Sequence, residues 1–122
     1  MVPIRGLYEV AIPVRSLPGS ETFYRRVLGL EVGLRDESRN WLFLRTRGGA
    51  GMIVLQEQDG AFPTYHFAFT IDEADLDRAT ATLREAGVAT RGPVYHAWIP
   101  GKSLYFVDPD GHDLELFAAT KS

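Results

Sequence analysis

Cysteine is absent from the 122 residues of this chain. Its absence excludes disulfide bonds, thiolate metal sites and a cysteine nucleophile. Long apolar runs are also absent: none approaches the length that spans a membrane, and the first residues lack the apolar segment of a secretory signal. Nor is there a surplus of positive charge, since 13 Lys and Arg residues stand against 16 Asp and Glu. We therefore expect a cytoplasmic protein that binds neither membranes nor nucleic acid.

The residues that are present suit a globular domain, with 45% hydrophobic and 24% charged side chains. Alternating apolar residues indicate strands, and apolar residues at helical spacing indicate two helices. Ser20 is expected to cap the first helix and Gly29 to end it, and the second helix is expected over 72–86, before Gly87. The expected strands cover residues 7–14, 30–34, 41–45, 52–56, 66–71, 88–90 with 94–98, 104–107 and 112–118.

The last two strands flank the sequence Asp-Pro-Asp-Gly at 108–111, which is strong turn chemistry and predicts a β-hairpin. Glu115 stands out in the returning strand because it lies between Leu114 and Leu116. Successive side chains of a strand point to opposite faces, so Glu115 faces away from the two leucines. If the leucines face a core, Glu115 faces either water or a site.

The order of elements repeats, because each half of the chain reads β-α-β-β-β. Glu9 stands twenty residues before Gly29, and His66 stands twenty-one before Gly87. The ends of the halves also match, with Val54 in the place that Glu115 holds in the second half. We therefore predict an α+β fold. It is a single domain over 1–122 built of two βαβββ modules, 5–58 and 64–119, joined by a linker at 59–64.

The repeat defines equivalent positions, and three of them hold Glu9, His66 and Glu115. By strand parity all three point away from the apolar face that the helices should cover. Imidazole and carboxylate ligands without thiolate suit divalent iron, manganese, cobalt, nickel or zinc. Each residue taken alone is better explained as a solvated strand carboxylate or a surface histidine, so the case for a metal site rests on the three together.

The chain resembles the vicinal oxygen chelate superfamily, which includes glyoxalase I, fosfomycin-resistance enzymes, bleomycin-resistance proteins and extradiol dioxygenases. The resemblance covers the whole chain. It is carried by the duplicated modules, by Phe-Tyr-Arg-Arg-Val-Leu-Gly-Leu at 23–30, and by Leu-Tyr-Phe-Val-Asp-Pro-Asp-Gly-His-Asp-Leu-Glu-Leu at 104–116. It implies a glyoxalase/dioxygenase-type cup, a divalent metal, a small-molecule substrate and a homodimer, with a site formed within one chain or shared between two.

A narrower resemblance, from Val94-Tyr95-His96 through Tyr105 to Glu115, is to extradiol ring-cleavage dioxygenases. It implies that Glu115 and His66 are metal ligands, that Tyr105 binds a substrate oxygen, and that His96 positions substrate or oxygen. His96 is explained equally well as a polar residue beside Trp98 at the rim of a strand. Two features depart from that pattern: Glu9 replaces the first ligand histidine, and no histidine precedes His66. With Glu9 the site is more anionic and harder, so Fe²⁺ or Mn²⁺ is favoured, with Zn²⁺, Ni²⁺ or Co²⁺ as alternatives.

Other branches stay open as alternatives to a metal-dependent dioxygenase. Glyoxalase-like lyase or isomerase chemistry normally uses four protein ligands, and Val54 occupies the place of one of them. A phosphonate substrate requires several basic residues around it. Lys102 is the only candidate near the hairpin, so the sequence argues against a phosphonate substrate. A non-catalytic, bleomycin-resistance-type antibiotic-binding protein is compatible with the net charge of −3.

Overall fold

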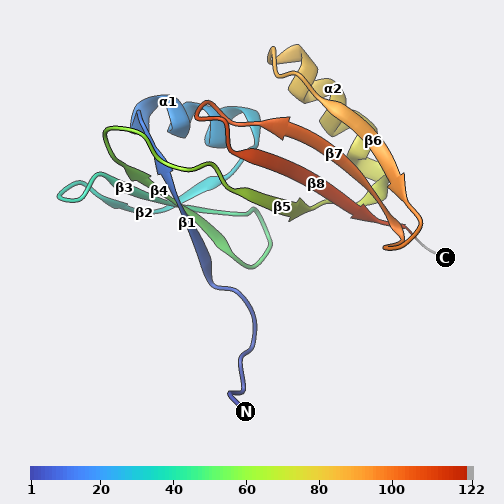
Figure 1. The fold of residues 1–122 in the computed structure, drawn as a ribbon, viewed down its shortest axis with the longest axis horizontal. Coiled ribbons are helices and arrows are strands. Elements are labelled where there is room, and N and C mark those ends of the chain that lie inside the picture. The colour runs from blue at the N-terminus through green and yellow to red at the C-terminus, as the bar shows by residue number, and fades with distance from the viewer. Residues whose placement is uncertain (121–122) are drawn as a thin grey trace. The chain divides into compact units, whose positions relative to one another are not determined.

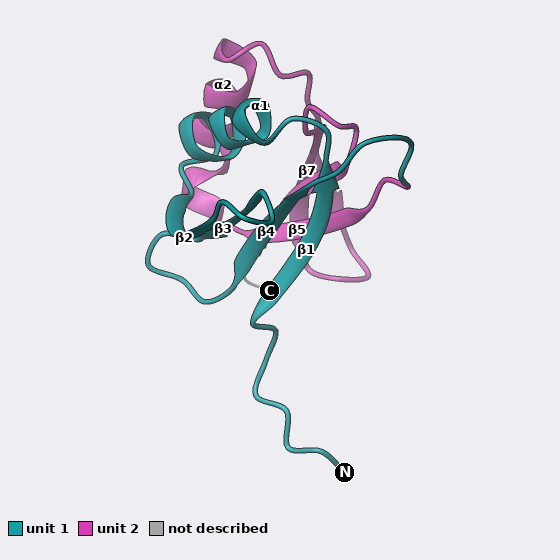
Figure 2. Ribbon diagram, turned by 90° about the vertical axis from the view of Figure 1, so that its left-hand side faces the viewer, with its two compact units in different colours: residues 1–62 teal, residues 63–122 magenta. Residues whose placement is uncertain are grey.

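The structure is a computed structural model that describes residues 1–120. The chain divides into two compact units, residues 1–62 and the part that begins at Pro63 (Figure 2). Each unit contains one four-stranded sheet and helical turns, which confirms an α+β fold of two similar modules. The bounds 5–58 and 64–119 stay a prediction. Within the described residues no helix is long and apolar enough to cross a membrane.

The first unit has the sheet order β1-β4-β3-β2, in which β1 and β4 run parallel. Its helical segment begins at Leu17 rather than after Ser20, because Ser16 is the cap: its Oγ accepts a hydrogen bond of 3.2 Å from the backbone N–H of Gly19. Ser20 is buried inside the helix, so its prediction as the cap is wrong. The elements are β1 (Glu9–Val14), α1 (Leu17–Thr22), the π turn η1 (Phe23–Val27), β2 (Glu31–Asp36), β3 (Trp41–Arg45) and β4 (Met52–Glu57) (Figure 1).

The second unit repeats this plan with the sheet order β5-β8-β7-β6 and a parallel pair of β5 and β8. Its elements are β5 (His66–Thr70), the short 3₁₀ turn η2 (Glu73–Asp75), α2 (Leu76–Glu85), β6 (Arg91–His96), β7 (Gly101–Val107) and β8 (Asp113–Ala119). The equal strand order in both units confirms the internal duplication. Nζ of Lys102 on β7 is 3.0 Å from a carboxylate oxygen of Glu73, and this ion pair connects η2 to the sheet.

The two faces of the second sheet differ in polarity. Alternation along β7 and β8 places Leu104, Phe106, Leu114 and Leu116 on one face, and all four are buried. Ser103, Tyr105 and Glu115 point to the opposite face, since side chains alternate along a strand. The hairpin forms as predicted, because the Asp108 carboxylate accepts hydrogen bonds from the backbone N–H groups of Asp110 and His112, each 2.9 Å long.

Two local predictions differ from the structure. Residues 88–90 form no strand, since Gly87 ends the preceding helical turn in a left-handed conformation (φ +81°) and pairing resumes only at Arg91. Trp98 lies in the turn between β6 and β7 and is 82% exposed, so it belongs neither to a strand nor to the core. His112 is fully buried, and its Nδ1 accepts a 3.0 Å hydrogen bond from the backbone N–H of Tyr65, so its ring has a structural role.

Candidate functional site

The closest pair of candidate ligands lies on the polar face of the second sheet. Nε2 of His66, the first residue of β5, is 3.1 Å from Oε1 of Glu115 on β8. His66 stands opposite Asp113 in the parallel ladder, so Glu115 is its diagonal neighbour. The Glu115 side chain is 13% exposed and that of His66 54%, so the pair sits at the edge of solvent where a small ligand can reach it.

The hydrogen bond of the other imidazole nitrogen fixes the tautomer of His66. Nδ1 lies 3.2 Å from the backbone carbonyl oxygen of Asp113. A carbonyl oxygen only accepts, so Nδ1 carries the hydrogen. In the neutral ring the lone pair of Nε2 therefore faces the carboxylate oxygen of Glu115. Two acceptors 3.1 Å apart require a cation between them, either a proton or a metal ion.

Ser103 holds the second oxygen of Glu115. Its hydroxyl is fully buried and donates a 2.6 Å hydrogen bond to Oε2 of Glu115. Because that hydroxyl has one hydrogen, Nε2 of His96, 2.9 Å from the Ser103 oxygen, must donate to it. The same Nε2 is 3.2 Å from the hydroxyl of Tyr105. The structure thus joins His66, Glu115, Ser103, His96 and Tyr105 in one hydrogen-bonded chain.

The proton assignment leaves the hydroxyl of Tyr105 available to a ligand. His96 donates toward the Tyr105 oxygen, so the tyrosine hydrogen is free to point elsewhere. Glu115 accepts from Ser103 through one oxygen and faces His66 through the other. A substrate oxygen near Tyr105 and Glu115 therefore meets the hydroxyl donor of Tyr105, while the imidazole N–H groups of His96 and His66 are already hydrogen-bonded.

A row of side chains crosses the sheet at the same level. Arg91 of β6 pairs with Tyr105 of β7, and Tyr105 pairs with Glu115 of β8. The Arg91 guanidinium lies 5.1 Å above the centre of the Tyr105 ring. Lys102 points to the opposite, helical face and is paired there with Glu73, so it is not the basic residue of this site.

Glu9 belongs to the other unit. It is the first residue of β1, as His66 is of β5. The ladders also make Val54 the counterpart of Glu115, because Ala11 pairs with Val54 and Ala68 with Glu115. Among residues 1–120 no three His, Asp or Glu side chains are grouped closely enough to hold a metal ion. His66 and Glu115 are therefore brought together, and the assignment of Glu9 stays a prediction.

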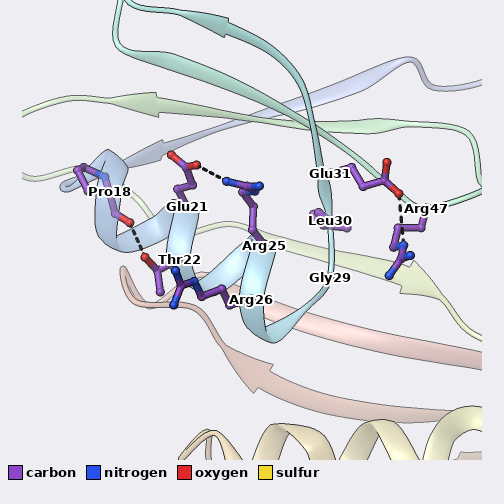
Figure 3. A pocket seen from close by; sticks show the side chains of 9 residues that line it. All are labelled: Pro18, Glu21, Thr22, Arg25, Arg26, Gly29, Leu30, Glu31 and Arg47. Atoms are coloured by element: carbon purple, nitrogen blue, oxygen red, sulfur yellow. Dashed lines mark hydrogen bonds and ion pairs between the residues drawn. The ribbon is translucent and has the colours of Figure 1, made fainter.

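A separate open pocket of about 570 Å³ lies in the first unit (Figure 3). Four of its charged side chains form ion pairs with one another: Oε2 of Glu21 is 2.9 Å from Nη1 of Arg25, and Oε1 of Glu31 is 3.3 Å from Nε of Arg47. Hydrogen bonds from Arg35, and then from Arg25, lower the pKa of Glu21 from 4.5 to about 2 against the opposing effect of burial. None of the predicted ligands lines it. The lining residues are Pro18, Glu21, Thr22, Arg25, Arg26, Gly29, Leu30, Glu31 and Arg47.

Two residues of the candidate site were not identified from the sequence. Ser103 lies two positions before Tyr105, and strand alternation alone places it on the same face. Arg91 had no such signal, because it reaches this face through an irregularity in β6 between Arg91 and Val94. Glu57, at the end of β4, does not belong to this site: it accepts a 2.7 Å hydrogen bond from the backbone N–H of Leu17 and so supports the start of α1.

The chain belongs to the Glyoxalase/Bleomycin resistance protein/Dioxygenase superfamily, whose model matches residues 6–116. The fosfomycin resistance protein FosX of Mesorhizobium japonicum is 35% identical and aligns with 96% of this chain and 88% of its own length. The glutathione transferase FosA of Serratia marcescens is 31% identical over 93% of this chain and 80% of its own. A catechol-2,3-dioxygenase of Bacillus subtilis is 34% identical over 88% of this chain but only 39% of its own length.

Two solved structures are similar to this chain in fold and in sequence. The integron cassette protein HFX_CASS4 from the mobile metagenome of Halifax Harbour Sewage Outfall has a TM-score of 0.90 and 43% identity, with 94% of this chain and 99% of that chain covered. The antibiotic binding protein TnmS3 from Streptomyces sp. CB03234 has a TM-score of 0.84 and 25% identity, with 98% and 100% covered. The superfamily resemblance is thus confirmed. FosX and FosA are similar to this chain over most of their own length, whereas the catechol-2,3-dioxygenase is similar over 39% of its own length.

Proposed function

We propose that the chain is a divalent-metal-dependent enzyme that acts on a small molecule bound through its oxygen atoms. The observation that carries this proposal is the 3.1 Å approach of Nε2 of His66 to Oε1 of Glu115, with the imidazole hydrogen committed to Asp113 on the far side. That approach needs a cation, and a metal ion bound to both atoms satisfies it. The name metallothiol transferase, given to a FosB relative from Shouchella clausii that is 28% identical, points to the same chemistry.

The residues around this pair fit a metal. Imidazole and carboxylate suit divalent iron, manganese, zinc, nickel or cobalt, and metal-bound histidines usually donate their other N–H to a carbonyl or carboxylate, as His66 does to Asp113. Glu115 is oriented in the same manner by Ser103. We propose Glu9 as the third ligand, from the same chain or from the partner in a homodimer. A divalent ion held there supplies Lewis-acid stabilisation of negative charge on substrate oxygens.

The protein's own residues complete the proposed chemistry. Tyr105 donates its free hydroxyl hydrogen to a substrate oxygen. His96, anchored through its N–H to Ser103 and Tyr105, keeps that hydroxyl in place. The half-buried position of this hydrogen-bonded chain limits competition from water, which strengthens each of these contacts.

Two reactions are proposed for this site. The first is modification of a fosfomycin-like small molecule, suggested by the names of FosA and FosX, which are similar to this chain over most of their length. The second is extradiol ring cleavage, favoured by the 3.2 Å contact of His96 and Tyr105, the two residues that the dioxygenase resemblance assigns to substrate. The rival of both is antibiotic binding without catalysis or a metal; the name of TnmS3, an antibiotic binding protein, suggests the binding role.

Metal binding separates the enzyme proposal from that rival. The apoprotein is titrated with Mn²⁺, Fe²⁺ and Zn²⁺ under anaerobic conditions, alongside His66→Ala, Glu115→Gln and Glu9→Gln. We expect one ion per chain, at least 100-fold weaker binding in the His66 and Glu115 variants, and about 10-fold weaker binding in Glu9→Gln. Asp77→Asn, on α2, is the matched loss of an acidic charge and is expected to bind as the wild type does. A wild-type protein that binds no metal contradicts the proposal.

Activity then decides between the two reactions. The metal-loaded protein is assayed with fosfomycin and glutathione by ³¹P NMR, and with a catechol panel by oxygen uptake. Tyr105→Phe is expected to lower the active reaction at least 100-fold, because it removes one hydrogen-bond donor to a developing negative charge. Failure of both assays with a metal-loaded protein would redirect the proposal to isomerase or lyase chemistry.

The proposed homodimer has a direct test. If Glu9 comes from the partner, a mixture of Glu9→Gln and Glu115→Gln chains assembles hybrid dimers that hold one intact site, and metal binding returns to part of the chains. If Glu9 acts within its own chain, the mixture binds no better than the separate variants.

A further inference from the structure

An unpaired guanidinium, that of Arg91, lies beside Tyr105, which is in turn the neighbour of Glu115 across the sheet. Arg91 is exposed, and its side chain forms no ion pair or hydrogen bond with any residue in 1–120. Its guanidinium lies instead over the Tyr105 ring, 5.1 Å from the ring centre. Stacking on an aromatic face leaves the N–H donors at the edge of the guanidinium plane free for a ligand.

A bulge in β6 brings Arg91 to this face. Between Arg91 and Val94 the chain takes three steps, while β7 takes two from Tyr105 to Ser103. In a regular ladder Gly92 would stand opposite Tyr105, and Arg91 would point to the helical face. The extra residue shifts Arg91 opposite Tyr105 instead, and such bulges are known to re-aim side chains next to binding sites.

The bulge depends on a glycine. Gly92 has φ +106°, and a Cβ there would lie 2.8 Å from the carbonyl oxygen of Ser103 and 2.9 Å from the backbone nitrogen of Val94. No other residue fits without a shift of backbone. The same residue therefore keeps β6 against Ser103 and holds Arg91 over Tyr105.

The row from Arg91 through Tyr105 to Glu115 determines how far the Arg91 guanidinium lies from the proposed metal ligand Glu115. The strands β6, β7 and β8 are adjacent (Figure 1). Two strand spacings of about 4.8 Å place the Arg91 and Glu115 backbones about 10 Å apart. A small substrate spans that gap with one end at Glu115 and the other at the guanidinium.

We propose that Arg91 is the specificity-determining residue of the site and that it binds an oxyanionic group of the substrate, a phosphonate, phosphate or carboxylate. The guanidinium fork matches two oxygens of such a group, and Tyr105 lies between it and the metal pair. This inference rests on the proposed function, because it names the substrate class of the same site.

The test uses the metal-loaded protein with methylphosphonate and acetate as probes. Isothermal titration calorimetry measures the Kd of each probe. We expect the wild type to bind at least one of them, with the better probe identifying the anion class. Arg91→Gln is expected to weaken that binding 10- to 100-fold, and Arg91→Lys less, because lysine keeps the charge but loses the planar fork. Arg78→Gln, on α2, removes an equal charge and is expected to change the Kd less than twofold.

Three results would overturn the inference: no binding of either anion by the wild type, equal binding by Arg91→Gln, or an equal loss in Arg78→Gln. Circular dichroism of the Arg91 variants checks that they are folded. Failure of the proposed function itself appears differently, as absence of metal. An Arg91-dependent anion site that persists without metal would leave the inference standing while the enzyme proposal fails.

Discussion

The hydroxyl of Ser103 donates a 2.6 Å hydrogen bond to Oε2 of Glu115, whose other oxygen faces His66. Ser103 is fully buried, and it also accepts a hydrogen bond from His96. One serine thus links the pair proposed to hold a metal, His66 and Glu115, with the pair proposed to bind substrate, His96 and Tyr105.

Replacement of Ser103 by alanine is expected to weaken metal binding 10- to 100-fold, because residues that orient metal ligands typically contribute that much. The measurement is a Mn²⁺ titration followed by electron paramagnetic resonance. Ser38→Ala, in the exposed turn between β2 and β3, is the control. An unchanged Mn²⁺ affinity in Ser103→Ala would show that Glu115 needs no such support.

Gly92→Ala is expected to lower the free energy of unfolding by about 3 kcal/mol, because it adds a clash with the Ser103 carbonyl to the strain of a positive φ. Gly48→Ala is the matched control: it also has a positive φ, but its Cβ meets nothing within 4 Å, so we expect a loss of about 1 kcal/mol. Urea denaturation measures both. Equal losses would mean that β6 moves away from β7 at little cost.

Glu21 supports a prediction about pH. Its folded-state pKa of about 2 lies below its usual value of 4.5, so its ion pairs with Arg35 and Arg25 stabilise the fold above pH 4.5. That stabilisation disappears as pH falls from 4.5 toward 2. Because these are surface pairs, Glu21→Gln is expected to cost about 1 kcal/mol at pH 7 and almost nothing near pH 2.

Urea denaturation across pH 2 to 7 measures this difference. Glu85→Gln removes a carboxylate that forms no ion pair within residues 1–120, and it serves as the control. A difference between wild type and Glu21→Gln that stays constant across this range would contradict the lowered pKa.

Much of the fold could be predicted because its signals are local. The Asp-Pro-Asp-Gly turn and strict alternation around Glu115 fix the hairpin and the face of its side chains. The repeat of β-α-β-β-β then predicts that His66 begins a strand and groups it with Glu115 as a candidate ligand. The parallel ladder of β5 with β8 brings the two residues together.

The remaining features depend on register, which local patterns do not specify. Ser20 and Ser16 are both chemically suitable helix caps. In the structure Ser16 is the cap, because its Oγ accepts the hydrogen bond from the backbone N–H of Gly19. Arg91 reaches the polar face only through a bulge whose position is set by the pairing of β6 with β7. Trp98 is apolar, yet the turn that follows β6 leaves it in solvent.

His112 and the hairpin turn have a mechanical consequence. Asp108 holds the backbone N–H of His112, and the His112 ring in turn holds the backbone N–H of Tyr65, the residue just before His66. The Tyr65 carbonyl accepts from Asp113, two residues before Glu115. These hydrogen bonds connect the start of β5 to the start of β8. The spacing of the two proposed ligands is therefore set by buried residues outside the site, and the two ligands are lost or kept together when this end of the sheet opens.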